Sequence, residues 1–444
     1  MNNFKTFLKL KNTKVLFILL LSVTSCTKQI TDTYVGEGWS ANSINTVKFR
    51  KNALTTSGNY QFVAYYDADS HLVLGKRKLQ SKKWEILKSA YKGHTKDAHN
   101  SISIAIDGNG FVHVSWNHHD TKLRYVKSVK PYGLELGSEM QMTGLLEDKV
   151  TYPEFYNLPN GNLLFCYRSG QSGRGNLVLN SYDVNKDTWK QLQHNLIDGE
   201  NKRSAYWQTC IDTKGVIHIS WVWRETWDVS TNHDICYARS KDGGVTWEKS
   251  TGERYNLPIT LASAEQAWKI PQNSNLINQT AMSTDAHGNP FIASYWNEND
   301  ITQYQIVYLK DNAWQKINTG FRTTTFTLGG GGTKKIPISR PDIFINDFNK
   351  QTYINLLFRD EERQNKVSLA YASLNNRTEW NVKDLSETSV GEWEPNYDIN
   401  LWNSKKELDV FVQNVIQIDG EGVAETKASK VRVLKVKNLN KLYK

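Results

Sequence analysis

The sequence predicts an all-β fold, a seven-bladed β-propeller with four-stranded antiparallel blades. One unit occurs seven times: an apolar strand, a tight Asp, Asn or Gly turn, a second strand ending in aromatic residues, and a third strand. The chain contains 15 Trp and 21 Tyr but only 9 Pro, a composition that suits pleated sheet surfaces. Short strands at this period favour a propeller, whose closed ring leaves no open sheet edge, over a pair of β-sandwiches.

The seven units are recognised by their strand–turn–strand pattern. They cover residues 63–84, 102–116, 154–167, 209–223, 281–296, 342–358 and 396–412. The second unit turns at Asp107-Gly-Asn-Gly110, and the last is expected to turn near residues 403–406. The residues that precede the first strand of units two to seven lie 53 to 73 residues apart, at His99, Tyr152, Tyr206, Gln279, Arg340 and Glu394. That spacing is typical of propeller blades.

Two further motifs indicate turns rather than chemistry. Ser240-Lys-Asp-Gly-Gly-Val-Thr-Trp247 matches the Asp-box pattern of sialidase-like propellers, in which Asp and Gly form a turn over a packed Trp. Residues 329–332 are four glycines, which predict a flexible loop between blades five and six. This loop lacks the Lys-Ser/Thr of a phosphate-binding loop.

The N-terminus has the features of an export signal. Four lysines precede an apolar run, residues 15–23, that is too short to span a bilayer. Small residues then lead to Cys26, as at a bacterial lipoprotein cleavage site; an ordinary secretory signal with an incidental cysteine is the alternative. We expect residues 1–25 to be a lipoprotein signal peptide, Cys26 to be lipidated, and residues 26–444 to form a single catalytic propeller. The expected location is the outer membrane, cell surface or periplasm of a bacterium.

The net charge indicates which partners the protein can bind. The net charge is +10, or +6 without the four lysines of the first 25 residues, which favours an anionic partner. No Lys/Arg-rich block predicts nucleic-acid binding, and membrane contact is expected only through the lipid anchor.

Cys166, Cys210 and Cys236 lie in apolar runs, as buried core residues do. We expect no cofactor to be needed for catalysis, and a structural metal ion stays unassigned. Zinc ligands could come from Cys210, His218, His233, Cys236 and His287, whose spacing is not diagnostic.

One end of the predicted blades gathers candidate site residues. His99 precedes a strand, and His118 and His119 follow its antiparallel neighbour, so the hairpin should bring His99 close to one of them. The same end of later blades holds the expected substrate-binding residues Arg168, Trp223, His233, Tyr295 and Arg359, together with Arg224. Arg suits carboxylate or sulfate recognition, although Arg224 could instead pair with Glu225 or Asp234. No pair of catalytic carboxylates is evident, which argues against an ordinary glycosidase.

Several stretches resemble the BNR-repeat propeller family that includes the seven-bladed ulvan lyases. They are HNSISIAIDGNGFVHVSWNHH, TYPEFYNLPNGNLLFCYRSGQSGRGNLVLNSYD, HISWVWRET and TNHDICYARSKDGGVTW. The resemblance implies a carbon–oxygen lyase that performs β-elimination at C4 of a glucuronic or iduronic acid in ulvan, a sulfated rhamnose–uronate polysaccharide, or in its oligosaccharides. The product would be a 4,5-unsaturated uronate, formed by chain cleavage or by loss of water at the non-reducing end.

The same resemblance implies the catalytic residues. They would be His99, His119, Tyr167 as base or acid, and Arg224 as the group that neutralises the uronate carboxylate. The chain departs from the lyases at residues 180–182, Asn-Ser-Tyr, where many of them carry an Arg.

Two other functions stay open from the sequence. One is an α-L-rhamnosidase-type glycoside hydrolase of the same propeller type, and the other is a non-catalytic, glycan-binding surface lipoprotein. An unsaturated product that absorbs in the ultraviolet would separate the eliminating enzyme from both.

Overall fold

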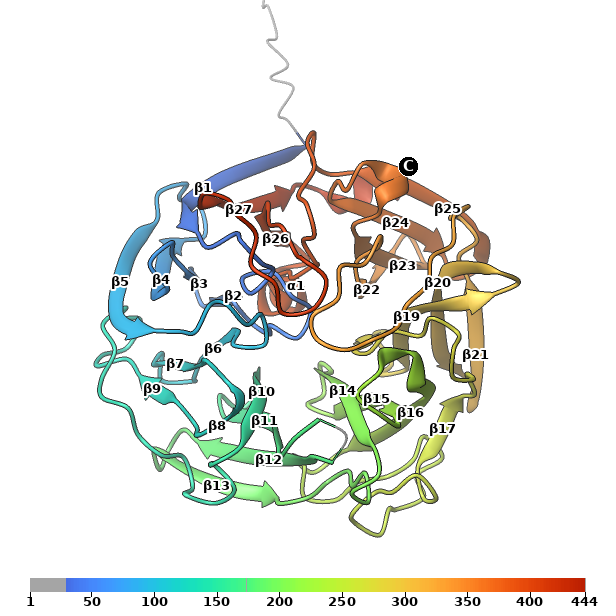
Figure 1. The fold of residues 1–444 in the computed structure, drawn as a ribbon, viewed down its shortest axis with the longest axis horizontal. Helices are drawn as coiled ribbons and strands as arrows, with labels where there is room; N and C mark the ends of the chain where they lie inside the picture. Colours follow the sequence, from blue (N-terminus) through green and yellow to red (C-terminus); the bar gives the residue numbers. More distant parts are fainter. Residues whose placement is uncertain (1–28, 173, 444) are drawn as a thin grey trace, which may run out of the picture.

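The chain forms a ring of seven antiparallel sheets, so the predicted seven-bladed β-propeller is confirmed (Figure 1). The computed structural model describes residues 29–172 and 174–443. The predicted signal peptide, residues 1–25, and Cys26 lie outside the described residues. Within the described part, no helix is both long and apolar enough to cross a membrane.

The first four blades follow the chain order. Blade one consists of β2 (Leu54–Ser57), β3 (Tyr60–Tyr66), β4 (His71–Lys78) and β5 (Glu85–Lys92). Blade two consists of β6 (Ile102–Ile106), β7 (Val112–Trp116) and β9 (Tyr125–Lys127). Blade three consists of β10 (Val150–Asn157), β11 (Leu163–Ser169), β12 (Asn176–Asp183) and β13 (Thr188–Gln193), with β8 (His119–Thr121) added beside β10. Blade four consists of β14 (Ser204–Ile211), β15 (Ile217–Arg224), β16 (Asn232–Ser240) and β17 (Glu265–Trp268).

The last three blades complete the ring. Blade five consists of β18 (Ala281–Thr284), β19 (Pro290–Glu298), β20 (Ile301–Lys310) and β21 (Ala313–Asn318). Blade six consists of β22 (Asp342–Phe348), β23 (Gln351–Phe358), β24 (Ser368–Ser373) and β25 (Asn376–Asp384). Blade seven consists of β26 (Leu408–Gln413), β27 (Ser429–Val436) and β1 (Ile30–Gly38). The helical pieces are α1 (Ile399–Lys405) and the 3₁₀ turns η1 (Val229–Thr231), η2 (Glu361–Arg363) and η3 (Leu439–Tyr443).

The hairpin turns of the repeat are held by one recurring arrangement. In blade two, the Asp107 carboxylate accepts hydrogen bonds from the backbone N–H groups of Asn109 and Phe111, both at 2.9 Å. Gly110 closes this turn with a φ of 87°, which glycine adopts without strain. β6 and β7 then pair from Ile102 with Trp116 down to Ile106 with Val112. The hairpin therefore forms in the predicted register.

The Asp-box also forms as predicted. Ser240 Oγ donates to the Asp242 carboxylate at 2.8 Å and accepts from the Gly244 N–H at the same distance. Trp247 is buried, and its indole N–H donates to Gly244 O at 3.1 Å. Of the cysteines, Cys166 and Cys236 are buried and Cys210 is half-buried, and all three are free thiols.

Two blades differ from the predicted four-stranded pattern. Blade two has only three strands in its own sheet. In blade seven, the segment expected to turn near residues 403–406 instead forms α1, and the innermost strand is reduced to a single bridge between Tyr397 and Val410. The buried Asp398 carboxylate caps α1 at Leu401 N and also accepts from Thr56 of blade one. This helix cap, fixed by the neighbouring blade, replaces the turn.

The ring is closed by the two ends of the chain. β1 pairs with β27 along its whole length, so the N-terminal strand is the outermost strand of the C-terminal blade (Figure 1). Val35 of β1 packs with Val431, Val433 and the blade-one residue Val63. Apolar contact across this joint links blade seven to blade one.

A buried segment between β1 and β2, residues 40–52, fills the centre of the ring; we call it the plug. Its residues 40–51 are all buried. The Lys48 N–H donates to Glu394 beside blade seven at 2.7 Å, whereas Asn52 donates to Phe155 O in blade three. Contacts to blades on opposite sides of the ring place the plug at its centre. No repeat or motif in the sequence predicted it.

We expect Asn45→Ala in the plug to lower the free energy of unfolding by roughly 2 kcal/mol, measured by urea denaturation. The Asn45 amide donates to Tyr66 O at 2.9 Å and accepts from Tyr66 N–H at 2.8 Å. Its removal takes the side-chain acceptor from the buried Tyr66 N–H and leaves Tyr66 O, among the described residues, with only the Trp39 N–H as a donor from outside the strand pairing. The control Asn185→Ala, on an exposed turn of blade three, should stay within about 0.5 kcal/mol of the unmodified protein. Equal stability of the two variants would contradict a structural role for the plug.

Candidate functional site

The candidate site lies where the inner strands begin and the second strands end, because these ends meet at one mouth of the ring. The six positions that the repeat aligns with one another belong to this mouth, and two of them, Tyr152 and Tyr206, lie near the start of β10 and β14 rather than before these strands. Three of them contact the plug residue Phe49: the His99 ring lies 5.1 Å from the Phe49 ring, the Tyr152 ring 5.2 Å, and the Arg340 guanidinium 5.5 Å. Phe49 is therefore the floor of the site.

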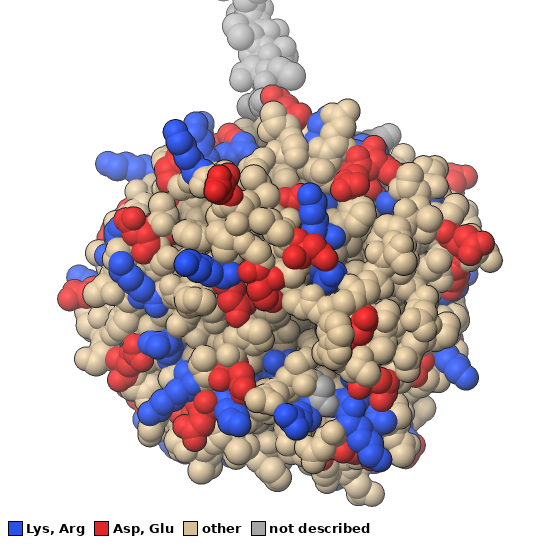
Figure 2. All heavy atoms as spheres, in the orientation of Figure 1, with Lys and Arg blue, Asp and Glu red and all other residues tan. Residues whose placement is uncertain are grey.

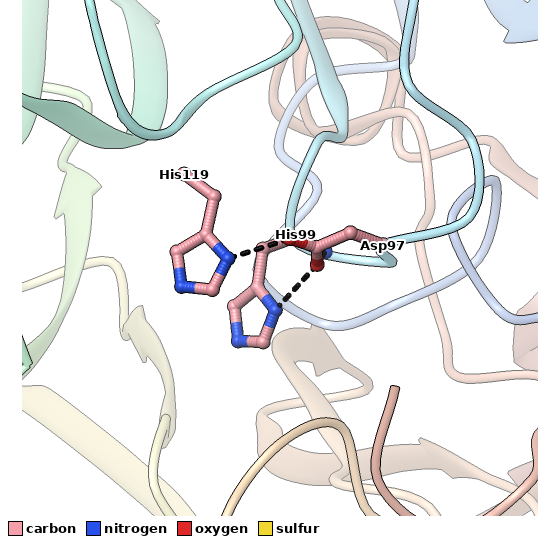
Figure 3. Close-up of side chains that lie close together, drawn as sticks. All are labelled: Asp97, His99 and His119. Carbon is pink, nitrogen blue, oxygen red and sulfur yellow. Dashed lines mark hydrogen bonds and ion pairs between the residues drawn. The ribbon is translucent and has the colours of Figure 1, made fainter. Parts of the chain in front are cut away.

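Two stacked histidines share one carboxylate at this mouth (Figure 3). The rings of His99 and His119 lie 4.1 Å apart at an interplanar angle of 18°. His99 Nδ1 is 2.9 Å from one oxygen of Asp97, and His119 Nδ1 is 2.6 Å from the other. The two Nε2 atoms lie on the opposite edges of the rings and point the same way. The hairpin thus brings His99 to His119, and both present their free nitrogen to the same space.

The position of His119 follows from its local backbone. Asn117 and Asp120 adopt left-handed φ angles of 65° and 55°, which these two residue types tolerate. The chain therefore turns sharply after β7, and the short strand β8 leaves blade two to pair with β10 of blade three. His119 lies opposite Thr151 in that pairing. The histidine of one blade is thus held by the next blade.

Asp97 is a site residue that the sequence analysis missed. Its carboxylate accepts the His99 N–H at 2.9 Å, so the carboxylate and the ring are fixed by the same short turn. Burial would raise the pKa of Asp97, but hydrogen bonds from His119 and His99 hold it well below its usual range. The only trace in the sequence is an acid two residues before the histidine.

His99 carries a positive charge at neutral pH. Burial by itself lowers the pKa of His99, but Asp97 and Glu421, whose Oε1 lies 3.3 Å from Nδ1, raise it to about 9.

His118 has a pKa shifted in the opposite direction. It is fully buried, its Nε2 accepts the Arg124 N–H at 3.1 Å, and burial lowers its pKa to about 3. His118 is therefore a neutral core residue.

Two tyrosines and two arginines lie beside the histidines. The Tyr152 ring is 5.9 Å from the His99 ring and 6.1 Å from the Tyr206 ring. The Arg168 guanidinium lies 5.0 Å from the Tyr152 ring, and that of Arg224 lies 5.5 Å from the Tyr206 ring. Arg168 Nη1 and Arg224 Nε are buried and have no hydrogen-bond partner among the described residues. Such guanidinium groups are suited to bind an anion.

The environment of Tyr206 favours its phenolate. Burial would raise the pKa of Tyr206, but Arg224, Arg168, a hydrogen bond with Ser172 Oγ at 3.1 Å, and His99 together lower it. For Tyr152, burial and the neighbouring Tyr206 outweigh the effect of Arg168, Arg224 and Arg340, and its pKa is raised. The surroundings therefore lower the pKa of Tyr206 and raise the pKa of Tyr152.

A strained backbone conformation places Tyr152 at the site. Its φ is 57°, unusual for a bulky residue, and it sits where the register of β10 against β11 shifts. Such strain costs roughly 1 to 3 kcal/mol and is typical of functional positions. Gly175 leaves room for the neighbouring arginine, because a Cβ there would lie 2.5 Å from Arg168 Cγ.

Tyr167, by contrast, is not brought to this cluster. It points into the core with Phe155 and Phe165, is fully buried, and donates its hydroxyl to Leu145 O at 3.2 Å. Along a strand, side chains alternate between faces, so the neighbouring Arg168 faces the site when Tyr167 faces the core. Tyr152 and Tyr206 occupy the positions that the repeat aligns with His99, and this equivalence identifies them as residues of the site.

The remaining expected substrate-binding residues have other surroundings. Trp223 is fully buried in the core, and Tyr295 is buried with its hydroxyl unpartnered among the described residues. His233 is held between Glu225 and Asp234 at 2.9 and 3.0 Å. The Arg359 guanidinium donates to Trp393 O, Ile336 O, Pro337 O and Asn365 Oδ1. Arg359 therefore has a structural role, whereas Arg168 lies at the site.

Two clusters of described residues hold three or more groups that could ligate a metal ion: Asp97 with His99 and His119, and Asp67 with Asp69 and His71. In the first, both Nδ1 atoms face a carboxylate oxygen and so act as hydrogen-bond donors rather than as ligands. In the second, the Lys88 ammonium already pairs with both carboxylates, at 2.8 and 2.9 Å. None of the five residues considered for zinc belongs to either cluster.

A cavity of about 540 Å³ lies at the opposite mouth of the ring. It is lined by the hairpin turns of blades three to six, by α1, and by the plug residues Lys51 and Asn52. Because Phe49 forms the floor of the candidate site, the plug separates this cavity from it. On the face drawn in Figure 2, which is hollowed near its centre, basic and acidic side chains are interspersed. The net positive charge is therefore not gathered in one patch on this face.

The comparisons with known proteins agree with the fold. Residues 60–322, more than half of the chain, match the family described as "BNR repeat-containing family member". The chain belongs to this family. The family resemblance noted in the sequence is thereby confirmed. Among curated proteins, no significant match to this chain was found.

Solved structures of polysaccharide lyases share the architecture. The polysaccharide lyase Uly1 is 16% identical with a TM-score of 0.67, and the match covers 91% of this chain and 99% of that chain. A PL25 ulvan lyase is 15% identical with a TM-score of 0.67, covering 92% and 98%. A PL25 ulvan lyase bound to -[GlcA(1-4)Rha3S]- is 15% identical with a TM-score of 0.66, covering 92% and 99%. At these identities the similarity establishes the fold.

We expect the His99 imidazole to titrate near pH 9 and His118 to stay neutral down to about pH 3, both followed by NMR. The pKa of His99 is raised above its unfolded value of about 6.5, so its ion pairs stabilise the fold fully below that pH. This contribution is lost as the pH rises through about 9. A midpoint of about 6.5 for His99 would contradict the described pairing with Asp97 and Glu421.

Proposed function

We propose that the protein is a carbon–oxygen lyase that performs β-elimination at C4 of a uronic acid in an anionic, sulfated rhamnose–uronate glycan such as ulvan. The observation that carries the proposal is the position of Tyr206. Tyr206 is buried, the guanidinium groups of Arg224 and Arg168 and the imidazolium of His99 act on its hydroxyl, and this environment lowers its pKa. A base, a carboxylate-binding pair and a proton donor are the three groups that such an elimination needs.

The arginines are assigned to the carboxylate of the substrate. A uronate C5 proton is removed easily only when the adjacent carboxylate is neutralised, because the developing negative charge spreads onto it. Arg168 Nη1 and Arg224 Nε offer buried N–H groups without a partner among the described residues. A bound carboxylate would pair with them and hold C5 close to Tyr206.

The proton transfers are assigned to the tyrosine and the histidines. Tyr206, as phenolate, takes the C5 proton, and the electrons form the C4–C5 double bond as the C4–O4 bond breaks. His99, as imidazolium, faces the site through Nε2–H and gives its proton to the leaving oxygen. His119 stacks on His99 and presents a second nitrogen to the same space. Tyr152 lies between the acid and the base.

Both kinds of leaving group fit this chemistry. A glycosidic O4 gives chain cleavage, and a free C4 hydroxyl at a non-reducing end gives loss of water. Mass spectrometry of the products from defined ulvan oligosaccharides separates them, since cleavage gives two fragments and dehydration gives one product lighter by a water. A saturated product would favour the α-L-rhamnosidase-type hydrolase, and binding without any product would favour a glycan-binding protein. We also propose that the protein acts outside the cytoplasm, anchored by a lipid at Cys26.

We expect Tyr206→Phe to reduce kcat by roughly 100-fold or more, because the variant keeps the ring but loses the base. Product formation is followed by ultraviolet absorbance of the unsaturated uronate. Tyr167→Phe is the matched control, since that buried tyrosine donates its hydroxyl to Leu145 O, away from the histidines and arginines of the site. Comparable losses in both variants would contradict the assignment of the base.

We expect Arg168→Ala to reduce kcat on a free uronate by roughly 100-fold. A methyl-esterified uronate carries no charge to neutralise, so its turnover should depend much less on Arg168. Arg363→Ala, which removes a blade-six arginine paired with Asp384 at 2.7 Å, should leave both rates unchanged. If Arg168→Ala lowers kcat equally on the methyl-esterified and the unesterified substrate, Arg168 does not act by neutralising the uronate carboxylate.

A further inference from the structure

The loop between β26 and β27, residues 414–428, crosses from blade seven toward the candidate site; we call it the strap. It is tied to the first residues of the plug, since Ile416 N donates to Ser40 O at 2.9 Å and Ala424 N donates to Ala41 O at 2.8 Å. Gln417 Oε1 accepts from Ser43 Oγ at 2.6 Å. In Figure 1 the strap is the red segment that runs over the centre of the ring. The strap is therefore an ordered part of the mouth.

The tip of the strap is fixed by the loop that follows the four glycines. Gly420 N donates to Thr333 O at 2.9 Å, and the Lys334 ammonium pairs with Asp419 at 2.6 Å. The backbone N–H of Thr333 donates to Glu421 Oε1 at 3.1 Å. The same Oε1 lies 3.3 Å from His99 Nδ1. These contacts hold the Glu421 carboxylate against one of the two stacked histidines.

The two histidines consequently have different surroundings. His99 faces two carboxylates, Asp97 and Glu421, and is 9% exposed, whereas the His119 ring has one polar side-chain partner within the described part of the chain, Asp97 at 2.6 Å. Two groups that share a carboxylate and stack ring on ring would otherwise be nearly equivalent. The other groups packed around His99 are the plug residue Phe49, Tyr152 and His119, with Tyr206 and its arginines beyond them.

We propose that Glu421 is a positioning residue that makes His99, rather than His119, the proton donor of the site. Its carboxylate fixes the His99 ring through Nδ1, with Nε2 toward the substrate, and compensates the charge of the imidazolium. This inference rests on the proposed function and adds a residue from the far end of the chain. Glu421 acts through His99 and does not touch the substrate.

The consequence for the reaction is a division of roles within the pair. When His99 gives its Nε2 proton to the leaving oxygen, the ring becomes neutral and Glu421 and Asp97 lose their cationic partner. Tyr206 then releases to water the proton that it took from C5, and His99 takes up a proton from water, so both groups are restored for the next turnover. His119 keeps its hydrogen bond to Asp97 throughout and orients that carboxylate.

The test compares Glu421→Gln with Asp419→Asn in the full chain. Glu421→Gln removes the charge but keeps an oxygen that can accept the Thr333 N–H, so the strap should stay in place. Asp419→Asn lies on the same strap and loses only the Lys334 pair, so it is the matched control. NMR titration of the His99 imidazole gives a readout that needs no substrate, and steady-state kinetics with an ulvan oligosaccharide gives kcat and KM.

For Glu421→Gln we expect the pKa of His99 to fall by about one unit, as on loss of a nearby opposite charge. We also expect kcat to fall roughly 10-fold with KM unchanged, and the alkaline limb of the kcat–pH profile to move to lower pH. Asp419→Asn should change none of these. In a His99→Ala background, Glu421→Gln should have no further effect on kcat.

The results separate this inference from the proposed function. An unchanged His99 titration in Glu421→Gln overturns the role of Glu421, whatever the activity. A shifted titration in a protein that forms no unsaturated product leaves the contact intact and overturns the elimination. If Glu421→Gln unfolds, Glu421→Asp, which keeps the charge, must restore the wild-type titration for the inference to stand.

Discussion

The plug is the feature on which the rest of the structure depends. A closed ring of seven sheets leaves a central channel that backbone alone cannot fill, and here residues 40–52 occupy it. Phe49 packs against residues of blades two, three and six at one level, and Lys48 pairs with Asp342 of blade six. These contacts join the inner edges of blades two, three and six through one buried segment. The side chains of the site can then be positioned against a common floor.

Around that floor, equivalent positions of the repeat have taken different roles. In blades two to four they are His99, Tyr152 and Tyr206, which meet the arginines that end the second strands. On the other side, Arg340 and Glu394 pair with each other at 2.8 and 2.7 Å and so compensate their own buried charges. The candidate site therefore lies on the side of blades two to four, whereas the Arg340–Glu394 pair on the other side has a structural role. The strap extends from blade seven and places Glu421 beside His99.

The repeat explains what could be predicted from the sequence and what could not. Strand alternation and Asp/Gly turns are local, so the blades and the hairpin that joins His99 to His119 were predictable from residues close in sequence. Tyr167 was assigned from the family resemblance, but the alternation of faces along β11 places it in the core and places Arg168 at the site. Tyr152 needs a bulge and a left-handed φ to reach the site, and neither is visible in the sequence. Glu421 lies 322 residues from His99, and nothing local links the two.

Closure of the ring by β1 has a consequence for the modularity of the protein. The part that matches the family, residues 60–322, contains both histidines, both tyrosines and both arginines of the candidate site. It contains neither the plug that forms the floor nor the strap that reaches His99, because these follow β1 and precede β27 at opposite ends of the chain. The segment that matches the family is therefore not a separable unit. A fragment that lacks these terminal segments would keep every predicted reactive group but would lose the floor of the site and the contact to His99. A fusion point or a circular permutation placed within these segments would disrupt the same two features.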